Sequence, residues 1–193
     1  HYPHHLISPG FIDTHVHYTQ TAMVGAYGAQ LLDWLNRYAF PTELQFADRA
    51  HATAMAKAFC DELARNGTTT ALVFCAVFPE SVDALFEEAE RRGLRLIAGK
   101  VLMDRHAPDG LLDTPQSAYD QSKALIARWH GRERLLYAIT PRFAPTSSPE
   151  QLELAGALWS EHPDVFVHSH LSESAAECAW VRESEERRVG KEC

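Results

Sequence analysis

The sequence lacks the features that mark several large classes of protein. It has 193 residues, and no apolar run approaches the ~20 residues of a membrane-spanning helix. No basic stripe with interleaved aromatic residues is present and the formal net charge is -8, so we expect no nucleic-acid partner. No glycine-rich phosphate loop follows any apolar run. The overall composition, 46% hydrophobic and 23% charged, is that of an ordinary soluble globular domain.

Cysteine is also scarce, and the four cysteines form no CxxC pair: Cys60, Cys75, Cys178 and Cys193. Cys60 and Cys75 stand in apolar surroundings, so we expect buried, reduced thiols and no thiolate metal site. The N-terminal HYPHHLIS has no basic region followed by an apolar core, so no secretory signal is visible. The chain does not begin with Met. We expect a cytoplasmic protein of which this chain is a part, truncated at both ends.

Apolar runs alternate with segments of helical periodicity along the chain. The runs occupy 6–17, 68–78, 94–104, 135–145 and 165–173. Helices are predicted at 31–40, 46–65, 81–93, 117–131 and 148–162, with a last one from about Ala175. The first should end before Pro41, and Ser148 is the expected N-cap before Pro149. This alternation predicts a parallel sheet with right-handed crossovers.

The first, third, fourth and fifth runs end in polar residues. These are His17 in the first, Asp104 in the third, Arg142 in the fourth, and His168, His170 and Glu173 in the fifth. Polar residues at the C-terminal ends of successive strands are typical of the active face of a (β/α)₈ barrel. The predicted fold class is therefore α/β, a partial TIM-like barrel containing about the first five strand–helix units. A doubly wound sheet is the alternative. Eight units need ~250 residues, so we expect only the first part of a barrel.

The stretch PGFIDTHVH places two histidines one residue apart near a strand end. Residues i and i+2 of a strand point to the same side, so His15 and His17 should project together and offer two nitrogens to one metal ion. Two surface histidines on an edge strand would give the same pattern, but the apolar residues before Asp13 favour a buried strand. Asp13 is a candidate for orienting a ligating histidine, or else a turn residue.

The stretch VHSHLSE repeats this spacing. His168 and His170 share a face of the fifth run, and Glu173 follows past its end. We expect His170 to be a third metal ligand and His168 to be a pocket residue outside the coordination sphere. A carboxylate near a metal-activated water can move protons, which is the role predicted for Glu173. An N-cap residue, or an acid in the first turn of the following helix, is the alternative.

The stretch ITPRFAP places an arginine beside an aromatic residue at the end of the fourth run. Arg142 and Phe143 could together hydrogen-bond and stack a planar heterocycle, although a salt-bridged arginine and a core phenylalanine would look the same. Gln20 follows the first histidine pair and offers both a donor and an acceptor, but lone glutamines are mostly surface residues.

Six segments together resemble the amidohydrolase superfamily and, within it, the branch whose members deaminate guanine: PGFIDTHVHYTQ, LLDWLNRYAFPTE, NGTTTALVF, GKVLMD, ITPRFAPTSS and HSHLSE. The resemblance spans about residues 6–182. PGFIDTHVH alone marks only the superfamily, whereas its combination with LLDWLNRYAFPTE and TPRF is more specific. The resemblance implies a cytoplasmic hydrolase that converts guanine to xanthine and ammonia.

The resemblance also implies roles for the candidate residues. His15, His17 and His170 would bind one zinc ion, Gln20, Arg142 and Phe143 would hold the purine, and Glu173 would be the proton shuttle. Water activated by zinc would attack the ring carbon that bears the amine, while Glu173 protonates a ring nitrogen and then helps ammonia leave. Relatives with two metals have a bridging carboxylated lysine at the fourth strand end. Here that position is Arg142, and Lys100 lies in the third run, which favours one metal.

Some groups that the resemblance implies are missing from this sequence. A further histidine and an aspartate that ligates zinc should follow beyond the fifth unit, so we expect this chain alone to be inactive, poorly stable or aggregating. The complete protein is expected to be a homodimer. Another aminoheterocycle deaminase or hydrolase of the superfamily and a non-catalytic metal-binding remnant are the alternatives.

The expected organisation has three parts. Residues 1–8 would be the tail of a missing N-terminal β-sandwich segment, 9–183 a partial metal-dependent hydrolase barrel, and 184–193 a non-native or disordered tail. The last expectation arises because ESEERRVGKEC is charged and lacks helical apolar spacing. A solvated helix end is the alternative.

Overall fold

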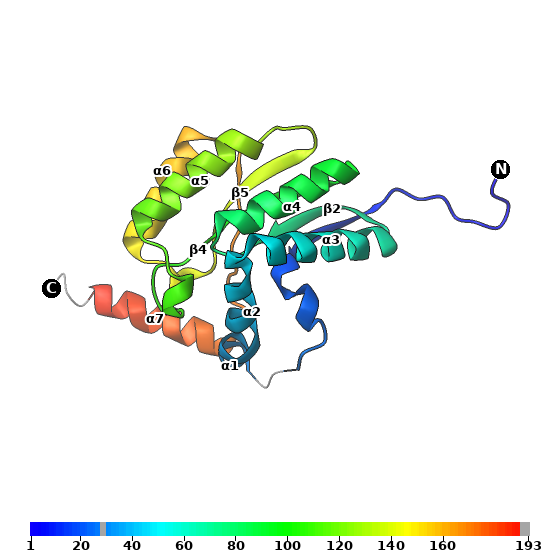
Figure 1. Cartoon of the computed structure of the whole chain (residues 1–193). Coiled ribbons are helices and arrows are strands. Elements are labelled where there is room, and N and C mark those ends of the chain that lie inside the picture. Colours follow the sequence, from blue (N-terminus) through cyan, green and yellow to red (C-terminus); the bar gives the residue numbers. More distant parts are fainter. Residues whose placement is uncertain (28–29, 190–193) are drawn as a thin grey trace.

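The computed structural model describes residues 1–27 and 30–189, and these contain one parallel sheet (Figure 1). Its strands are β1 (Phe11–His17), β2 (Thr68–Phe74), β3 (Arg95–Gly99), β4 (Val101–Leu102), β5 (Leu135–Pro141) and β6 (Phe166–Val167). β1, β2, β3 and β5 lie side by side in chain order, and β4 and β6 both pair with β5. A doubly wound sheet reverses its order at a switch point. This sheet does not, so the predicted partial barrel is confirmed.

Four helices connect these strands on one face of the sheet: α3 (Arg49–Arg65), α4 (Pro79–Arg92), α5 (Pro115–Trp129) and α6 (Pro149–Glu161). They pack side by side in this order, as Figure 1 shows. Ser148 is the N-cap of α6, as predicted, because its Oγ accepts the N–H of Gln151 at 3.1 Å. Gly93 ends α4 with a φ of +68°, a left-handed conformation that glycine adopts without strain.

Three of these helices begin elsewhere than predicted. α3 begins later, at Arg49, because the carboxylate of Asp48 accepts the N–H of Ala50 at 2.9 Å and caps the helix there. α4 begins earlier, at Pro79, since a proline suits the first helical turn, so Ser81 already lies inside the helix. α5 begins two residues earlier, at Pro115, because the hydroxyl of Thr114 accepts the N–H of Ser117 and caps the helix there.

The connection from β1 to α3 contains a helical segment that does not end before Pro41. α1 (Leu31–Trp34) leads into a π-helical turn over Leu35–Ala39, and α2 (Phe40–Leu44) follows directly. Pro41 therefore falls in the first turn of α2, where its missing N–H and its ring are tolerated. The continued helix brings α2 against the end of β5, where Glu43 of α2 contacts Arg142.

The main core lies between the sheet and the helices. Tyr18, Phe46 and Phe86 are among its fully buried side chains, and the Tyr18 hydroxyl donates to the Ser81 carbonyl at 2.6 Å. Each fully buried side chain of this size contributes roughly 1.5–3 kcal/mol. A second buried cluster contains Phe40, Phe74 and Phe143 and lies at the strand ends.

The cysteines agree with the prediction where the structure describes them. Cys60 and Cys75 are free and buried. Burial raises the pKa of the Cys60 thiol to about 12 and raises that of Cys75 well above its ordinary value. Cys178 is free but only partly buried, and Cys193 lies outside the described residues.

Both ends of the described sheet expose apolar residues. Phe11 and Ile12 of β1 are 66% and 69% exposed, and Phe166 and Val167 of β6 are 46% and 52% exposed. The prediction that the strand before Asp13 is buried is therefore wrong for this chain, because β1 pairs with β2 on one side only. An apolar groove of about 670 Å³ opens between β5, β6 and α6. Within residues 1–27 and 30–189, no helix combines the length and apolarity that a membrane crossing needs.

The last helix, α7 (Ala175–Val189), begins where predicted and includes most of the charged C-terminal segment. Residues 190–193 lie outside the described residues. That 184–193 is non-native sequence stays a prediction, as does the assignment of residues 1–8 to a β-sandwich.

Candidate functional site

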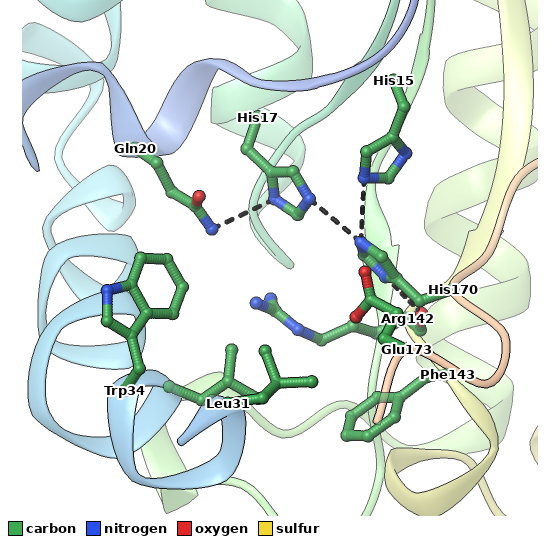
Figure 2. A pocket seen from close by; sticks show the side chains of 10 residues that line it. His15, His17, Gln20, Leu31, Trp34, Arg142, Phe143, His170 and Glu173 are labelled. Atoms are coloured by element: carbon green, nitrogen blue, oxygen red, sulfur yellow. Dashed lines mark hydrogen bonds between the residues drawn. The ribbon is translucent and has the colours of Figure 1, made fainter. Parts of the chain in front are cut away.

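The two histidine pairs meet at the C-terminal end of the sheet. β1 ends at His17, and the segment that follows β6 places His170 beside it. Arg142 and Phe143 follow β5 at the same rim. A cavity of about 150 Å³ lies here (Figure 2). It is lined by His15, His17, Gln20, Leu31, Trp34, Leu35, Arg142, Phe143, His170 and Glu173.

Three imidazole rings converge on one point of this rim, as Figure 2 shows. His170 Nε2 lies 3.1 Å from His15 Nε2 and 3.1 Å from His17 Nε2. One ring nitrogen from each histidine lies within 4.8 Å of the others. Three imidazole nitrogens that face one point form a donor set for a divalent transition metal.

The second nitrogen of each of these rings has a partner of its own. The three contacts are His170 Nδ1 to the Arg142 carbonyl at 2.8 Å, His17 Nδ1 to Gln20 Nε2 at 3.2 Å, and His15 Nδ1 to His168 Nε2 at 3.0 Å. Metal-ligating histidines commonly show this arrangement, because a bonded second nitrogen fixes the tautomer and the ring orientation. Gln20 must turn its carbonyl oxygen to His17 for that ring to ligate through Nε2, since Nδ1 then carries the proton.

Burial favours the neutral form of His17, His168 and His170. It lowers the pKa of His17 well below its ordinary value, and the nearby Arg142 guanidinium adds to the effect. Burial also lowers the pKa of His170, and that of His168 to about 4. Neutral imidazole is the form that binds metals, so His17 and His170 need lose no proton when a metal ion enters at neutral pH.

His168 and Asp13 both contact His15, in different ways. His168 is 7% exposed, and its Nδ1 has no hydrogen-bond partner within the described residues. Asp13 Oδ1 accepts the peptide N–H of His15 at 3.0 Å, so it acts on the main chain and not on the ring. The register of β1 against β2 shifts between Asp13 and Val16, and such an irregularity re-aims side chains.

Arg142 combines the two roles that the sequence left open. Its Nη1 donates to Glu43 Oε2 at 2.7 Å, and the arginine side chain is 3% exposed, so it is a buried salt-bridge partner. Its guanidinium nevertheless lines the cavity. Phe143 likewise belongs to the buried cluster at the strand ends and also lines the cavity.

Glu173 lies on the exposed loop before α7, and Figure 2 shows its carboxylate beside His170. The acid in the first turn of α7 is Glu177 and not Glu173, so the alternative role considered for Glu173 is wrong. Glu177 is buried, and its two oxygens accept the N–H groups of Ser172 at 3.1 Å and of Glu173 at 2.8 Å. These bonds hold a loop in which Ser172 has a φ of +58°.

Several residues of the site were not predicted. Leu31, Trp34 and Leu35 line the cavity, although nothing in their helical spacing indicated which surface they would cover. Glu43 lies beyond the predicted helix end and so escaped notice. Glu177 had a usable signal, since it follows Ser174 at the spacing of a capping box.

Two polar residues near strand ends lie outside the cavity lining. The carboxylate of Asp104 accepts the N–H of Ser148 at 2.7 Å and also its hydroxyl, so it supports the start of α6. Lys100 is buried between β3 and β4 and pairs with Asp113. Burial lowers the pKa of Lys100 and raises that of Asp113.

The whole chain can be compared with known families. The family model described as the amidohydrolase family matches residues 6–192. The chain belongs to the amidohydrolase family. Its partial barrel, with histidines at the strand ends, is the part of the fold that this match covers.

Individual relatives of this amidohydrolase chain are longer than it is. The guanine deaminase of Escherichia coli (strain K12) is 62% identical over 177 residues, which cover 92% of this chain and 40% of the relative. The solved structure of E. coli guanine deaminase superposes with a TM-score of 0.89 over 91% of this chain and 40% of that one. The chain thus spans about 40% of the length of these relatives.

Two further solved structures extend the comparison. Guanine deaminase from C. acetobutylicum, solved with guanine bound in its active site, is 31% identical, with a TM-score of 0.89 over 93% of this chain and 43% of that one. Atrazine chlorohydrolase from Arthrobacter aurescens, complexed with zinc, is 22% identical, with a TM-score of 0.75 over 84% of this chain and 40% of that one. At that identity the second likeness shows the fold alone.

Proposed function

We propose that the protein to which this chain belongs hydrolyses guanine to xanthine and ammonia with one zinc ion. The observation that carries the proposal is the convergence of three imidazole nitrogens beside a cavity lined by Arg142 and Glu173. The identity of 62% to E. coli guanine deaminase supports guanine as the substrate. Because the chain spans about 40% of that relative, the activity is ascribed to the whole protein.

The residues present fit a zinc ion. Zinc accepts imidazole nitrogens at ~2.0–2.1 Å, and catalytic zinc sites keep an open position beside their protein ligands. His15, His17 and His170 would hold the ion, since their Nε2 atoms face one point and burial keeps the rings of His17 and His170 neutral. A zinc ion held there would supply Lewis acidity, which activates water near neutral pH.

Arg142, Phe143 and Gln20 would bind the purine. A guanidinium donates in one plane to a carbonyl oxygen or a ring nitrogen, and an aromatic face stacks on a planar ring. Gln20 can donate and accept, and it also contacts His17, so it lies between the ligand and the metal histidines. Trp34 and Leu31 complete the wall and exclude water from the bound ring.

Glu173 would move the protons of the reaction. The oxygen of one water molecule bonds to the ring carbon that bears the amine, and the carbon–nitrogen bond of that amine breaks. Glu173 would pass one proton of that water to the adjacent ring nitrogen as the carbon becomes tetrahedral, and then the water's second proton to the departing amine, so guanine and water yield xanthine and ammonia. Its carboxylate lies beside His170 at the cavity, which is where such transfer is needed.

The 193-residue chain on its own should turn over no guanine. Its described residues offer three nitrogen ligands at the rim, whereas the resemblance of the sequence to the superfamily implies a further histidine and an aspartate that ligates zinc. Activity and metal binding are therefore separate expectations for this chain, and the second does not require the first.

The test uses the complete open reading frame that encodes this chain, loaded with zinc and supplied with guanine. We expect equal amounts of xanthine and ammonia. H170N should lose zinc and activity together, whereas H4N, which changes an exposed histidine in the N-terminal segment, should keep both. Faster deamination of another aminoheterocycle in a substrate panel would overturn guanine as the substrate. Full zinc content in H170N would overturn the metal assignment.

A further inference from the structure

Glu43 places a buried carboxylate against the arginine of the cavity. It comes from α2, 99 residues before Arg142, and its Oε2 accepts a hydrogen bond from Arg142 Nη1 at 2.7 Å. The side chain of Glu43 is fully buried and does not line the cavity itself. Phe40, from the same short helix, lies under the guanidinium, with 5.2 Å between its ring centroid and Arg142 Cζ.

These two contacts fix the guanidinium from the side away from the cavity. A carboxylate that accepts from one nitrogen fixes the direction of the planar group, and an aromatic face beneath it fixes the plane. Figure 2 shows the guanidinium directed into the cavity, between His17 and Leu31. Nitrogens not used by Glu43 are thereby offered to a ligand in a defined plane.

The Glu43–Arg142 ion pair orients the arginine more than it stabilises the fold. Glu43 Oε1 is buried and has no hydrogen-bond partner within the described residues, so the carboxylate is only half satisfied. A buried ion pair is weak evidence for stability, because replacing it with apolar side chains of similar volume often leaves the stability of the fold unchanged or increases it. What the pair provides, and apolar side chains would not, is a fixed array of donors at the cavity wall.

We propose that Glu43 is a positioning residue that fixes the Arg142 guanidinium for the acceptor atoms of a planar heterocycle. The inference rests on the proposed function and adds to it a residue outside the cavity lining. It predicts that Glu43 affects the affinity for a ligand with a ring carbonyl. The histidines of the metal site have other hydrogen-bond partners and should not depend on Glu43.

The metal ligands depend on a different part of Arg142. The carbonyl of Arg142 accepts His170 Nδ1 at 2.8 Å and the His170 peptide N–H at 3.0 Å. This carbonyl belongs to the main chain at the end of β5 and needs no salt bridge. Loss of Glu43 should therefore weaken ligand binding and leave zinc affinity unchanged.

The experiment compares E43A, E43Q and a control, E153A, which removes an exposed glutamate of α6, in the complete open reading frame loaded with zinc. E43A should raise the KM for guanine by roughly 10- to 100-fold, as expected for loss of a charged hydrogen-bond partner, with a smaller change in kcat. E43Q keeps an acceptor oxygen and should recover part of the loss. With 2-aminopurine, which lacks the ring carbonyl, the loss in E43A should largely vanish. E153A should match wild type throughout.

A second measurement keeps the inference testable apart from activity. The ¹⁵N order parameter of the Arg142 Nε–H should be high in wild type and fall in E43A and E43Q, with zinc affinity constant. If wild type fails to deaminate guanine, the proposed function fails, and this order parameter still decides the role of Glu43. An unchanged order parameter, or an equal loss for guanine and 2-aminopurine, would overturn the inference. Removal of one partner of a buried ion pair can unfold a protein. If E43A does not fold, the order parameter and the KM values are compared between wild type and the isosteric E43Q.

Discussion

His168 should make the metal-free protein sensitive to acid. Its side chain is buried beside His15, and burial, with the neighbouring histidines, lowers its pKa from 6.5 to about 4. In the unfolded chain the pKa returns to 6.5, so the unfolded state binds more protons between these two values. Stability is therefore fully present above pH 6.5 and falls as the pH drops towards 4. A pKa difference of about 2.5 corresponds to about 3 kcal/mol.

The variant H168Q isolates this effect. A glutamine amide reaches the place of His168 Nε2, so it keeps the contact with His15 without titrating. Urea unfolding of both proteins with a chelator, at about pH 7.5 and about pH 4.5, measures the free energy of unfolding. Wild type should lose about 2–3 kcal/mol more than H168Q between these conditions. The two proteins differ only at this position, so equal losses would refute a neutral, buried His168.

Three further predictions concern the sheet, the proton shuttle and the open edge. In G99A a Cβ would lie 1.8 Å from the Ala138 carbonyl oxygen across β3 and β5, so the free energy of unfolding should fall by about 3 kcal/mol or more. The control G156A, where a Cβ meets nothing within 4 Å, should change it by under about 1 kcal/mol in the same urea titration. E173Q should lower kcat by roughly 10²- to 10⁴-fold with unchanged zinc content, and an unimpaired rate would exclude Glu173 as the shuttle. F166K places a charge on the open edge and should reduce light scattering of the 193-residue chain, whereas unchanged aggregation would locate the cause elsewhere.

The fold could be predicted because its signals are local. Apolar runs separated by helices of similar length specify parallel strands with crossovers, and Ser148 and Gly93 mark helix ends by their own chemistry. The helix through Pro41 could not be predicted, because a π-helical turn just before the proline is a feature of the folded backbone. The exposure of Phe11 could not be predicted either, since the burial of a residue in β1 depends on which strands flank it.

The candidate site was predictable where spacing sufficed. The first HxH stretch places His15 and His17 on one rim because residues two apart in a strand share a face. His168 and His170 follow β6 and lie outside a strand, so the shared face predicted for them does not explain how His170 reaches the rim. Contacts between residues distant in the chain gave no such signal. Glu43 and Arg142 lie 99 residues apart, and no periodicity within either segment indicates that they meet.

The order of strands in the sheet has a consequence for synthesis on the ribosome. Each of β2, β3 and β5 emerges after the strand beside which it will lie, so the sheet can assemble while translation continues. His17 and His170 are 153 residues apart, and at ~5–20 residues per second the second follows the first by about 8–30 s. Until then the nascent chain carries only two of the three histidines that converge at the rim. A metal ion bound by all three rings would therefore enter a sheet whose first strands are already made.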